Sequence, residues 1–228
     1  MERENTMETA KDRLLDAALP HVAFDGWSET TLRAAMSDSQ TPEGLGRALF
    51  PRGGVDMAIA YHQRGDAAMV ERLAASDLTA LRFRDRISTA VRFRLEAVAD
   101  RELARRGSAL FSLPGHAADG ARAIWGTADA IWTALGDTSR DINWYSKRAT
   151  LSAVYASTLL FWLGDQSDGH QASWDFLDRR IENVMQIEKL KAGFRENPLG
   201  KALLAGPLKI LARIHAPERR DDLPGRAL

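Results

Sequence analysis

The five histidines are the side chains of this chain best suited to catalysis or metal binding: His21, His62, His116, His170 and His215. None has a carboxylate three residues earlier, so the Glu-x-x-His pairs of di-iron helical bundles are absent. The sequence also contains no cysteine and none of the HExxH, P-loop, GxGxxG or GxSxG motifs. We therefore expect a protein that is not an enzyme, with no catalytic residue, metal site or cofactor.

A second group with chemical potential combines two aromatic and two charged residues: Asp141, Trp144, Tyr145 and Arg148. Their spacing of i, i+3, i+4 and i+7 places them on one face of a helix. We expect the first turns of this helix to emerge where Arg148 reaches water, and exposed Trp, Tyr and Arg together are typical of a protein-interface hot spot. The alternative is that Trp144 and Tyr145 close the end of a helical bundle with their polar atoms outward.

A third group consists of large apolar side chains at helical spacing, interleaved with alanine and glycine. Such a stripe is more often core than pocket, but small residues beside large aromatic ones leave room for an apolar ligand. We expect the following residues to line a lipid-binding cavity: Phe93, Trp125, Ile131, Trp132, Tyr155, Leu159 and Trp162.

Helices must position all three groups, because the apolar spacing is helical nearly everywhere and no stretch alternates with a period of two. The first sixty residues predict three short helices, with Asp25 and Gly26 ending the first, Ser28 capping the second and Pro42 in the first turn of the third. Longer helices are predicted at residues 55–75, 85–106, 117–136, 142–163 and 172–192. The fold class is therefore all-α.

We divide the chain into a helix-turn-helix-like unit at residues 1–60, a lipid-binding helical bundle at 61–192, and an amphipathic helix with a tail at 193–228. The most apolar stretch, residues 151–163, is shorter than the ~20 residues of a membrane-spanning helix, which predicts a buried helix instead. The first twelve residues have neither a secretory signal nor an arginine-rich transit peptide, so we expect the mature protein to begin here.

The formal net charge of zero is a cancellation between the two ends of the chain. Residues 1–60 contain six basic and ten acidic residues, a net charge of −4, whereas residues 179–228 contain eleven basic and six acidic ones, a net charge of +5. On the third short helix Arg47 is the one side chain that could make a charged contact to DNA, and Glu43 opposes it. We expect no nucleic acid partner.

The basic end of the chain has an amphipathic pattern from residue 199 onward. Leucines on one face and basic residues opposite them are typical of a helix that lies in a membrane interface, although docking on the bundle or on a dimer mate is an equal alternative. The expected membrane-binding residues are Leu199, Leu203, Leu204, Leu208, Leu211, Ile214, Lys201, Lys209 and Arg213.

The first sixty residues resemble the helix-turn-helix unit of TetR-type regulators. In that pattern an Asp-Gly turn ends the first helix, Thr-Leu starts the second and Phe-Pro closes the recognition helix, as Asp25-Gly26, Thr31-Leu32 and Phe50-Pro51 do here. The resemblance implies a TetR-like helical bundle, for which a homodimer is the expected assembly.

Three further segments resemble the accessory lipid-binding family of ubiquinone (coenzyme Q) biosynthesis, the ninth in the coenzyme Q series. They are DINWYSKRA at 141–149, LSAVY at 151–155 and SWDFLDRRI at 173–181, with support from FPRG at 50–53. The resemblance implies a non-enzymatic protein that binds isoprenoid quinone intermediates and presents them to a di-iron hydroxylase. It also implies that the hydroxylase binds at Asp141, Trp144, Tyr145 and Arg148.

The resemblance implies docking on a membrane surface through the terminal helix. Because mitochondrial members of that family have a transit peptide, we expect a bacterial cytoplasmic protein, peripheral on the inner membrane. Two other functions stay open, a ligand-responsive TetR-type transcriptional repressor and a helical adaptor without a ligand.

Overall fold

The chain folds as a set of helices, and the computed structural model describes residues 2–196 and 216–217. Within those residues there is no β-strand, which confirms the all-α prediction. In chain order the α-helices are α1 (Glu2–Asp25), α2 (Glu29–Asp38), α3 (Glu43–Leu49), α4 (Gly54–Ala74), α5 (Phe83–Glu96), α6 (Arg101–Ser112), α7 (Ala117–Ala134), α8 (Ile142–Gly164) and α9 (Gln171–Glu196). A short 3₁₀ helix, η1 (Asp168–His170), precedes α9.

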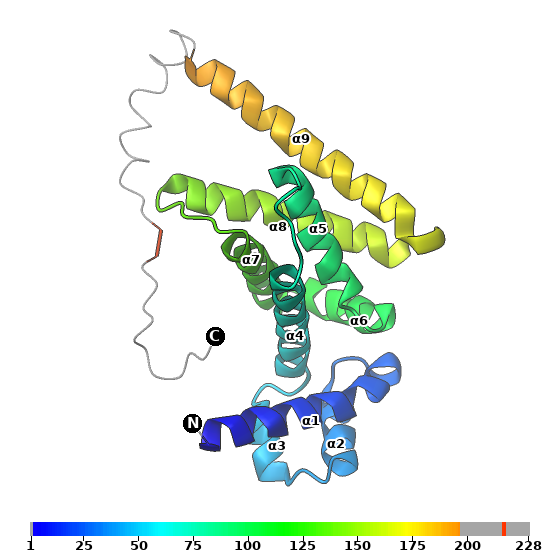
Figure 1. Ribbon diagram of the computed structural model, residues 1–228. Helices are drawn as coiled ribbons and strands as arrows, with labels where there is room; N and C mark the ends of the chain where they lie inside the picture. The colour runs from blue at the N-terminus through cyan, green and yellow to red at the C-terminus, as the bar shows by residue number, and fades with distance from the viewer. Residues whose placement is uncertain (1, 197–215, 218–228) are drawn as a thin grey trace.

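Helices α1 to α3 form a trihelical unit at one end of the molecule (Figure 1). Ser28 caps α2 as predicted, because its hydroxyl oxygen accepts a hydrogen bond from the Thr31 backbone N–H at 3.2 Å. The Thr31 hydroxyl donates to the Gly26 carbonyl at 2.6 Å, which fixes the turn between α1 and α2. Leu14 and Leu32 are fully buried in the small core that holds these helices together.

Helix α4 connects this unit to the larger bundle without a linker (Figure 1). Its early residues Met57 and Ala58 belong to the trihelical core, whereas Met69 and Leu73 belong to the bundle core. The first residue of α4, Gly54, has no room for a side chain, because a Cβ there would lie 2.2 Å from the Trp27 carbonyl oxygen. The boundary drawn at residue 60 falls inside this helix and stays a prediction.

The prediction of one helix over residues 85–106 is wrong, because α5 ends at Glu96 and α6 starts at Arg101. The physical cause is Asp100, whose carboxylate accepts a hydrogen bond from the Glu102 backbone N–H at 2.8 Å and so caps a new helix. The other four long helices start and end within a few residues of their predicted bounds.

Helix α8 packs against both α7 and α9 in the bundle (Figure 1). Leu151 and Tyr155 are buried as predicted, but Leu160 is 65% exposed, so one face of the apolar stretch is open. The expected homodimer stays a prediction. Across the described part of the chain, no helix combines the length and hydropathy needed to cross a membrane.

The amphipathic segment expected to bind a membrane falls outside the described residues. Membrane binding by this segment therefore stays a prediction for all nine of its named residues: Leu199, Lys201, Leu203, Leu204, Leu208, Lys209, Leu211, Arg213 and Ile214.

Candidate functional site

The start of α8 gathers the predicted aromatic residues with one from α7. Asp141 caps the helix, because its carboxylate accepts a hydrogen bond from the Asn143 backbone N–H at 3.0 Å. The half-buried rings of Trp144 and Tyr145 pack edge to face with centroids 4.8 Å apart, and Trp125 lies 5.9 Å from Trp144. We call Asp141, Trp144 and Tyr145 the aromatic patch.

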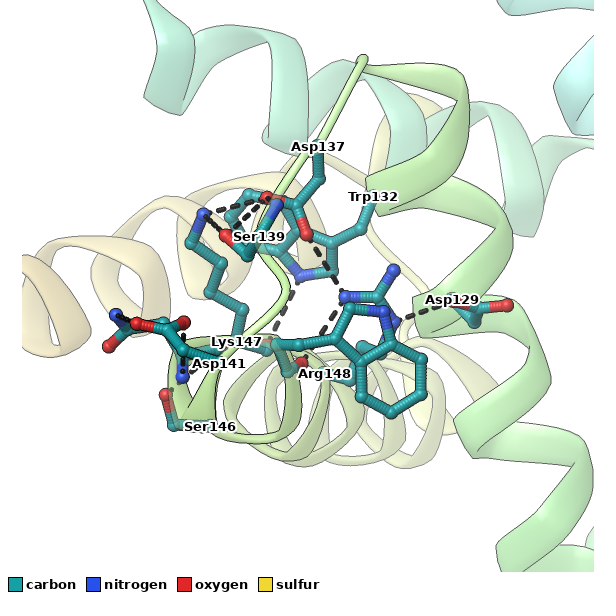
Figure 2. A network of polar contacts seen from close by, with 10 residues as sticks. Asp129, Trp132, Asp137, Ser139, Asp141, Ser146, Lys147 and Arg148 are labelled. Carbon is teal, nitrogen blue, oxygen red and sulfur yellow. Dashed lines mark hydrogen bonds and ion pairs between the residues drawn. The ribbon is translucent and has the colours of Figure 1, made fainter. Parts of the chain in front are cut away.

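Arg148 lies beneath the aromatic patch, and the expectation that it reaches water is wrong. Its side chain is 2% exposed, because two carboxylates draw the guanidinium inward. Its Nε donates to Asp129 at 2.6 Å and its Nη1 to Asp137 at 3.0 Å (Figure 2). The guanidinium also lies 4.0 Å from the centre of the Trp144 ring, a cation–π contact. Arg148 therefore supports the patch from inside, and its role in partner binding stays a prediction.

The carboxylate of Asp137, in the turn between α7 and α8, binds the charged side chains of both Lys147 and Arg148. Lys147 Nζ donates to Asp137 at 2.7 Å and to Ser139 at 2.7 Å, while the Trp132 indole donates to the Lys147 carbonyl at 3.1 Å (Figure 2). Burial would raise the pKa of Asp137, but hydrogen bonds from Lys147, Ser139 and Arg148 outweigh burial and lower that pKa to about 2.

Sequence reasoning missed Asp129 and Asp137 as partners of Arg148. A local signal existed for Asp137, because it follows Gly136 at a helix end and is followed two residues later by Ser139. That order favours the turn in which the Asp137 carboxylate accepts from the Ser139 hydroxyl at 2.8 Å.

Among the described residues, the bundle contains two apolar cavities of a size that suits a ligand. The larger, about 370 Å³, is partly open to solvent and is lined by residues of α4 to α8 and by Trp27; we call it the Tyr61 cavity. The smaller, about 230 Å³, lies between α5, α7, α8 and α9, and we call it the Trp132 cavity. Both are lined mostly by apolar side chains, as ligand pockets commonly are.

The seven residues expected to line a lipid cavity do not lie together. Tyr155 and Leu159 line the Tyr61 cavity and Trp132 lines the other. The remaining four line neither of these two cavities, namely Phe93, Trp125, Ile131 and Trp162.

Each of those four side chains is occupied by packing. Ile131 is fully buried in the core, and Trp125 packs on the aromatic patch. The Phe93 ring lies 3.8 Å below the Arg72 guanidinium, and Trp162 is buried with Arg101 5.4 Å from its ring. Helical spacing identified apolar residues but not the ones facing a void.

The Tyr61 cavity has a polar end that sequence reasoning missed. His62 Nε2 and the Thr127 hydroxyl lie 2.8 Å apart, and Thr127 donates to Asp66 at 2.8 Å. Arg94, 3% exposed, donates to Asp66 and to the His62 carbonyl. Burial, together with the nearby Arg94 charge, lowers the pKa of His62 to about 4, so this imidazole is neutral at neutral pH.

This buried histidine predicts a loss of stability in mild acid. The unfolded chain takes up a proton below a pKa of about 6.5, while the folded chain does so only near 4. Stability contributed by neutral His62 is therefore complete above about pH 7 and declines as the pH falls toward 4. Between about pH 7 and pH 5 we expect a loss of about 2 kcal/mol, measured by urea unfolding.

A His62→Gln variant, which cannot be protonated, should lose most of that pH dependence. His116→Gln serves as the matched control, because His116 lies outside this network, and it should retain the dependence. An equal slope in His62→Gln and in the unsubstituted protein would contradict the assignment.

The described residues contain no group of three or more His, Asp or Glu side chains that could hold a metal ion. On α3, Arg47 Nη2 lies 2.6 Å from Glu29 and 3.8 Å from Glu43. Arg47, the one basic residue of α3, which corresponds to the recognition helix of the TetR pattern, is thus paired with two acidic residues of its own chain.

The sequence of this chain is similar to COQ9 proteins. A family model described as COQ9 matches residues 117–188. The ubiquinone biosynthesis protein COQ9, mitochondrial, of Drosophila melanogaster is 28% identical over 193 residues, covering 82% of this chain and 59% of that protein. The COQ9 protein of Homo sapiens is 24% identical over 210 residues, covering 87% of this chain and 64% of the relative. The chain thus spans less than two thirds of the length of these relatives.

The expectation of a bacterial cytoplasmic protein on the inner membrane is contradicted by these relatives. The matching COQ9 proteins of Drosophila melanogaster, Dictyostelium discoideum and Homo sapiens are eukaryotic and are described as mitochondrial.

Among solved structures, the TetR transcriptional regulator from Nitrosomonas europaea matches with a TM-score of 0.64. The match covers 78% of this chain and 99% of that one at 19% sequence identity, so it concerns the fold alone. It confirms the predicted TetR-like architecture. In sequence the chain is similar to COQ9 proteins of ubiquinone biosynthesis, and in structure it has a TetR-like fold.

Proposed function

We propose that this chain is a non-enzymatic accessory protein of ubiquinone biosynthesis that binds an isoprenoid quinone intermediate in its helical bundle. The relatives are described as ubiquinone biosynthesis proteins, which supports the pathway. The single observation that carries the binding role is the Tyr61 cavity, about 370 Å³ of mostly apolar space inside the bundle. Pockets for small ligands have volumes of roughly 300–1,000 Å³, so the volume of the Tyr61 cavity suits part of a prenylated quinone molecule.

The physical need for such a protein follows from the cost of hydrating a polyprenyl tail. Each CH₂ group gains about 0.8 kcal/mol on leaving water, so a tail of several isoprene units does not travel unaided through an aqueous phase. A helical bundle that covers the ring and the first part of the tail lowers that cost.

The test is native mass spectrometry with lipid identification on protein purified from its native source. We expect a bound isoprenoid, and we expect its loss in Ala156→Phe, because Ala156 lines the Tyr61 cavity and a benzyl group there would fill it. Ala153→Phe is the matched control, since Ala153 is exposed on the same helix. It should keep the lipid.

Two outcomes would overturn the proposal. One is a native preparation that has no isoprenoid and, once delipidated, takes up none, which is the result expected of a ligand-free adaptor. The other is equal lipid occupancy in Ala156→Phe and the unsubstituted protein, which would place any lipid outside this cavity.

The aromatic patch is the proposed contact for the hydroxylase that receives the ligand. Its indole and phenol rings are half-buried and braced by Arg148, the combination of rigid aromatic groups that hot spots favour. The alternative of a DNA-binding repressor finds less support, because Arg47 is already paired with Glu29 and Glu43. A homodimer and a membrane-docking terminal segment are further parts of the proposal.

A further inference from the structure

Polar side-chain contacts join the trihelical unit of α1 to α3 to the bundle, in addition to the shared helix α4. The first comes from Arg52, in the turn between α3 and α4, whose Nη1 donates to the Asp119 carboxylate of α7 at 3.0 Å. Asp56 orients Arg52 for this contact, because its carboxylate accepts from the Arg52 backbone N–H and from its Nε, each at 2.8 Å. A guanidinium that is already oriented loses less side-chain entropy when it binds a second carboxylate.

The burial of Asp119 distinguishes this contact from an ordinary surface ion pair. The Asp119 side chain is 10% exposed, and Arg122 of the same helix binds its other carboxylate oxygen at 3.0 Å. A carboxylate withdrawn from water is stable only when cations or hydrogen-bond donors compensate its charge. Separation of Arg52 from Asp119 would leave that carboxylate with the exposed Arg122 alone, so the joint resists opening.

A second contact joins the unit to α6 in the interior. Trp27, in the turn between α1 and α2, is 6% exposed, and its indole N–H donates to the Leu103 carbonyl of α6 at 3.1 Å. A tryptophan side chain buries about 150–250 Å². Movement of α6 away from the unit would therefore expose this ring to water and leave its N–H without its partner.

A third contact brings a positive charge to the C-terminal end of α1. The carbonyl groups in the last turn of a helix lack partners within the helix and attract cations, but α1 has no basic residue in its own last turn. Arg106 of α6 provides the cation, because its Nη2 donates to the Ala23 carbonyl at 2.8 Å. A rotation of the unit against α6 would break this bond as well.

We propose that the trihelical unit and the helical bundle move as one rigid body, and that the contacts of Arg52, Trp27 and Arg106, which we call the clamp, hold them together. The unit then serves as a fixed support for the N-terminal halves of α6 and α7. A ligand-responsive repressor needs the opposite behaviour, a reading unit with two positions that the ligand favours unequally. The clamp consists of protein atoms alone, so this inference does not depend on ligand binding by the bundle.

Double electron–electron resonance between two spin labels tests the clamp, and the chain suits this method because it has no cysteine of its own. Ser37→Cys on α2 and Ala153→Cys on α8 place the labels at exposed positions of the unit and of the bundle. We expect one narrow distribution of distances between the labels. With Arg52→Met and Arg106→Met added, two of the three contacts are lost, and the distribution should broaden about twofold.

Two comparisons separate release of the clamp from other effects. Arg82→Met is the matched control, because Arg82 binds Asp85 within a single stretch of chain at α5, and it should leave the distribution unchanged. Amide hydrogen exchange in α2 should stay slow in the double variant, because the buried Leu32 and the rest of the unit's own core are retained. If exchange shows that the double variant unfolds the unit, Arg52→Met alone provides the test, since its side chain is 53% exposed.

Two results would overturn the inference. A broad or two-peaked distribution in the protein that carries only the labels would show that the unit already has more than one position. An unchanged distribution in the clamp variants would show that Arg52 and Arg106 do not hold the unit in place.

Discussion

Replacing Asp137 by alanine is expected to destabilise the protein by about 3 kcal/mol, because it leaves the buried Arg148 guanidinium short of a carboxylate. Removing one partner of a buried ion pair lowers the free energy of unfolding by roughly 3–5 kcal/mol. We expect the lower value here, because Asp129 still binds Arg148. Lys147 also loses its carboxylate partner and keeps the Ser139 hydroxyl and a cation–π contact with the Trp132 ring. Urea unfolding at neutral pH measures the difference.

Matched variants separate the buried charge from other effects. Asp85→Ala breaks an exposed contact to Arg82 and should change stability little. The double variant Asp137→Leu with Arg148→Met removes both charges and should recover most of the loss, because replacing a buried pair by apolar residues is often neutral. If Asp137→Ala unfolds at the same urea concentration as the unsubstituted protein, the Arg148 network is not a stabilising element.

The same carboxylate predicts a second loss of stability in stronger acid. Its folded pKa of about 2 lies below the ordinary value near 3.9, so its contribution is present above about pH 4 and is lost as the pH falls toward 2. This window lies below that of His62, whose contribution declines between about pH 7 and pH 4. The two groups can therefore be distinguished in one pH series.

Local signals predicted much of the fold. Ser28 and Asp141 act as helix caps through their own nearest turns, so the sequence around them is sufficient to predict where α2 and α8 begin. The break between α5 and α6 was equally local, since Asp100 has the same capping chemistry. It was missed because apolar spacing on both sides of it continues without interruption.

The site depends on contacts that local patterns do not contain. Arg148 meets Asp129 from the neighbouring helix, and Arg94 meets Asp66 from another, so the burial of both arginines follows from how helices pack. The spacing of Asp141, Trp144 and Tyr145 did place them on one face. It could not tell that Arg148, on the same face, turns inward.

Helix α8 connects the two halves of the proposed function. It begins at the aromatic patch and continues to Tyr155, Ala156 and Leu159 on the cavity wall. At ~1.5 Å per residue, Trp144 and Ala156 lie about 18 Å apart along the axis. If the proposed function holds, a quinone ring in the Tyr61 cavity lies too far from the patch to touch a partner bound there, and its presentation would require the ligand to move after docking.

Trp144→Ala is expected to weaken binding of the proposed hydroxylase by about thirtyfold or more, because buried indoles at hot spots contribute at least about 2 kcal/mol. The indole is held by Tyr145 at 4.8 Å, Trp125 at 5.9 Å and the Arg148 guanidinium at 4.0 Å, so it meets a partner without further ordering. Pull-down of the hydroxylase tests binding, and an affinity measurement with one partner immobilised on a surface gives the ratio of the dissociation constants of Trp144→Ala and the unsubstituted protein.

The control for that experiment is Phe24→Ala, which removes an aromatic ring that is 84% exposed at the end of α1. It should leave partner binding unchanged, and isoprenoid binding should persist in both variants because neither residue lines the Tyr61 cavity. Trp144→Ala that still binds the hydroxylase with unaltered affinity would exclude the aromatic patch as the contact. Loss of isoprenoid binding in the same variant would instead indicate that the patch and the cavity are coupled through α8.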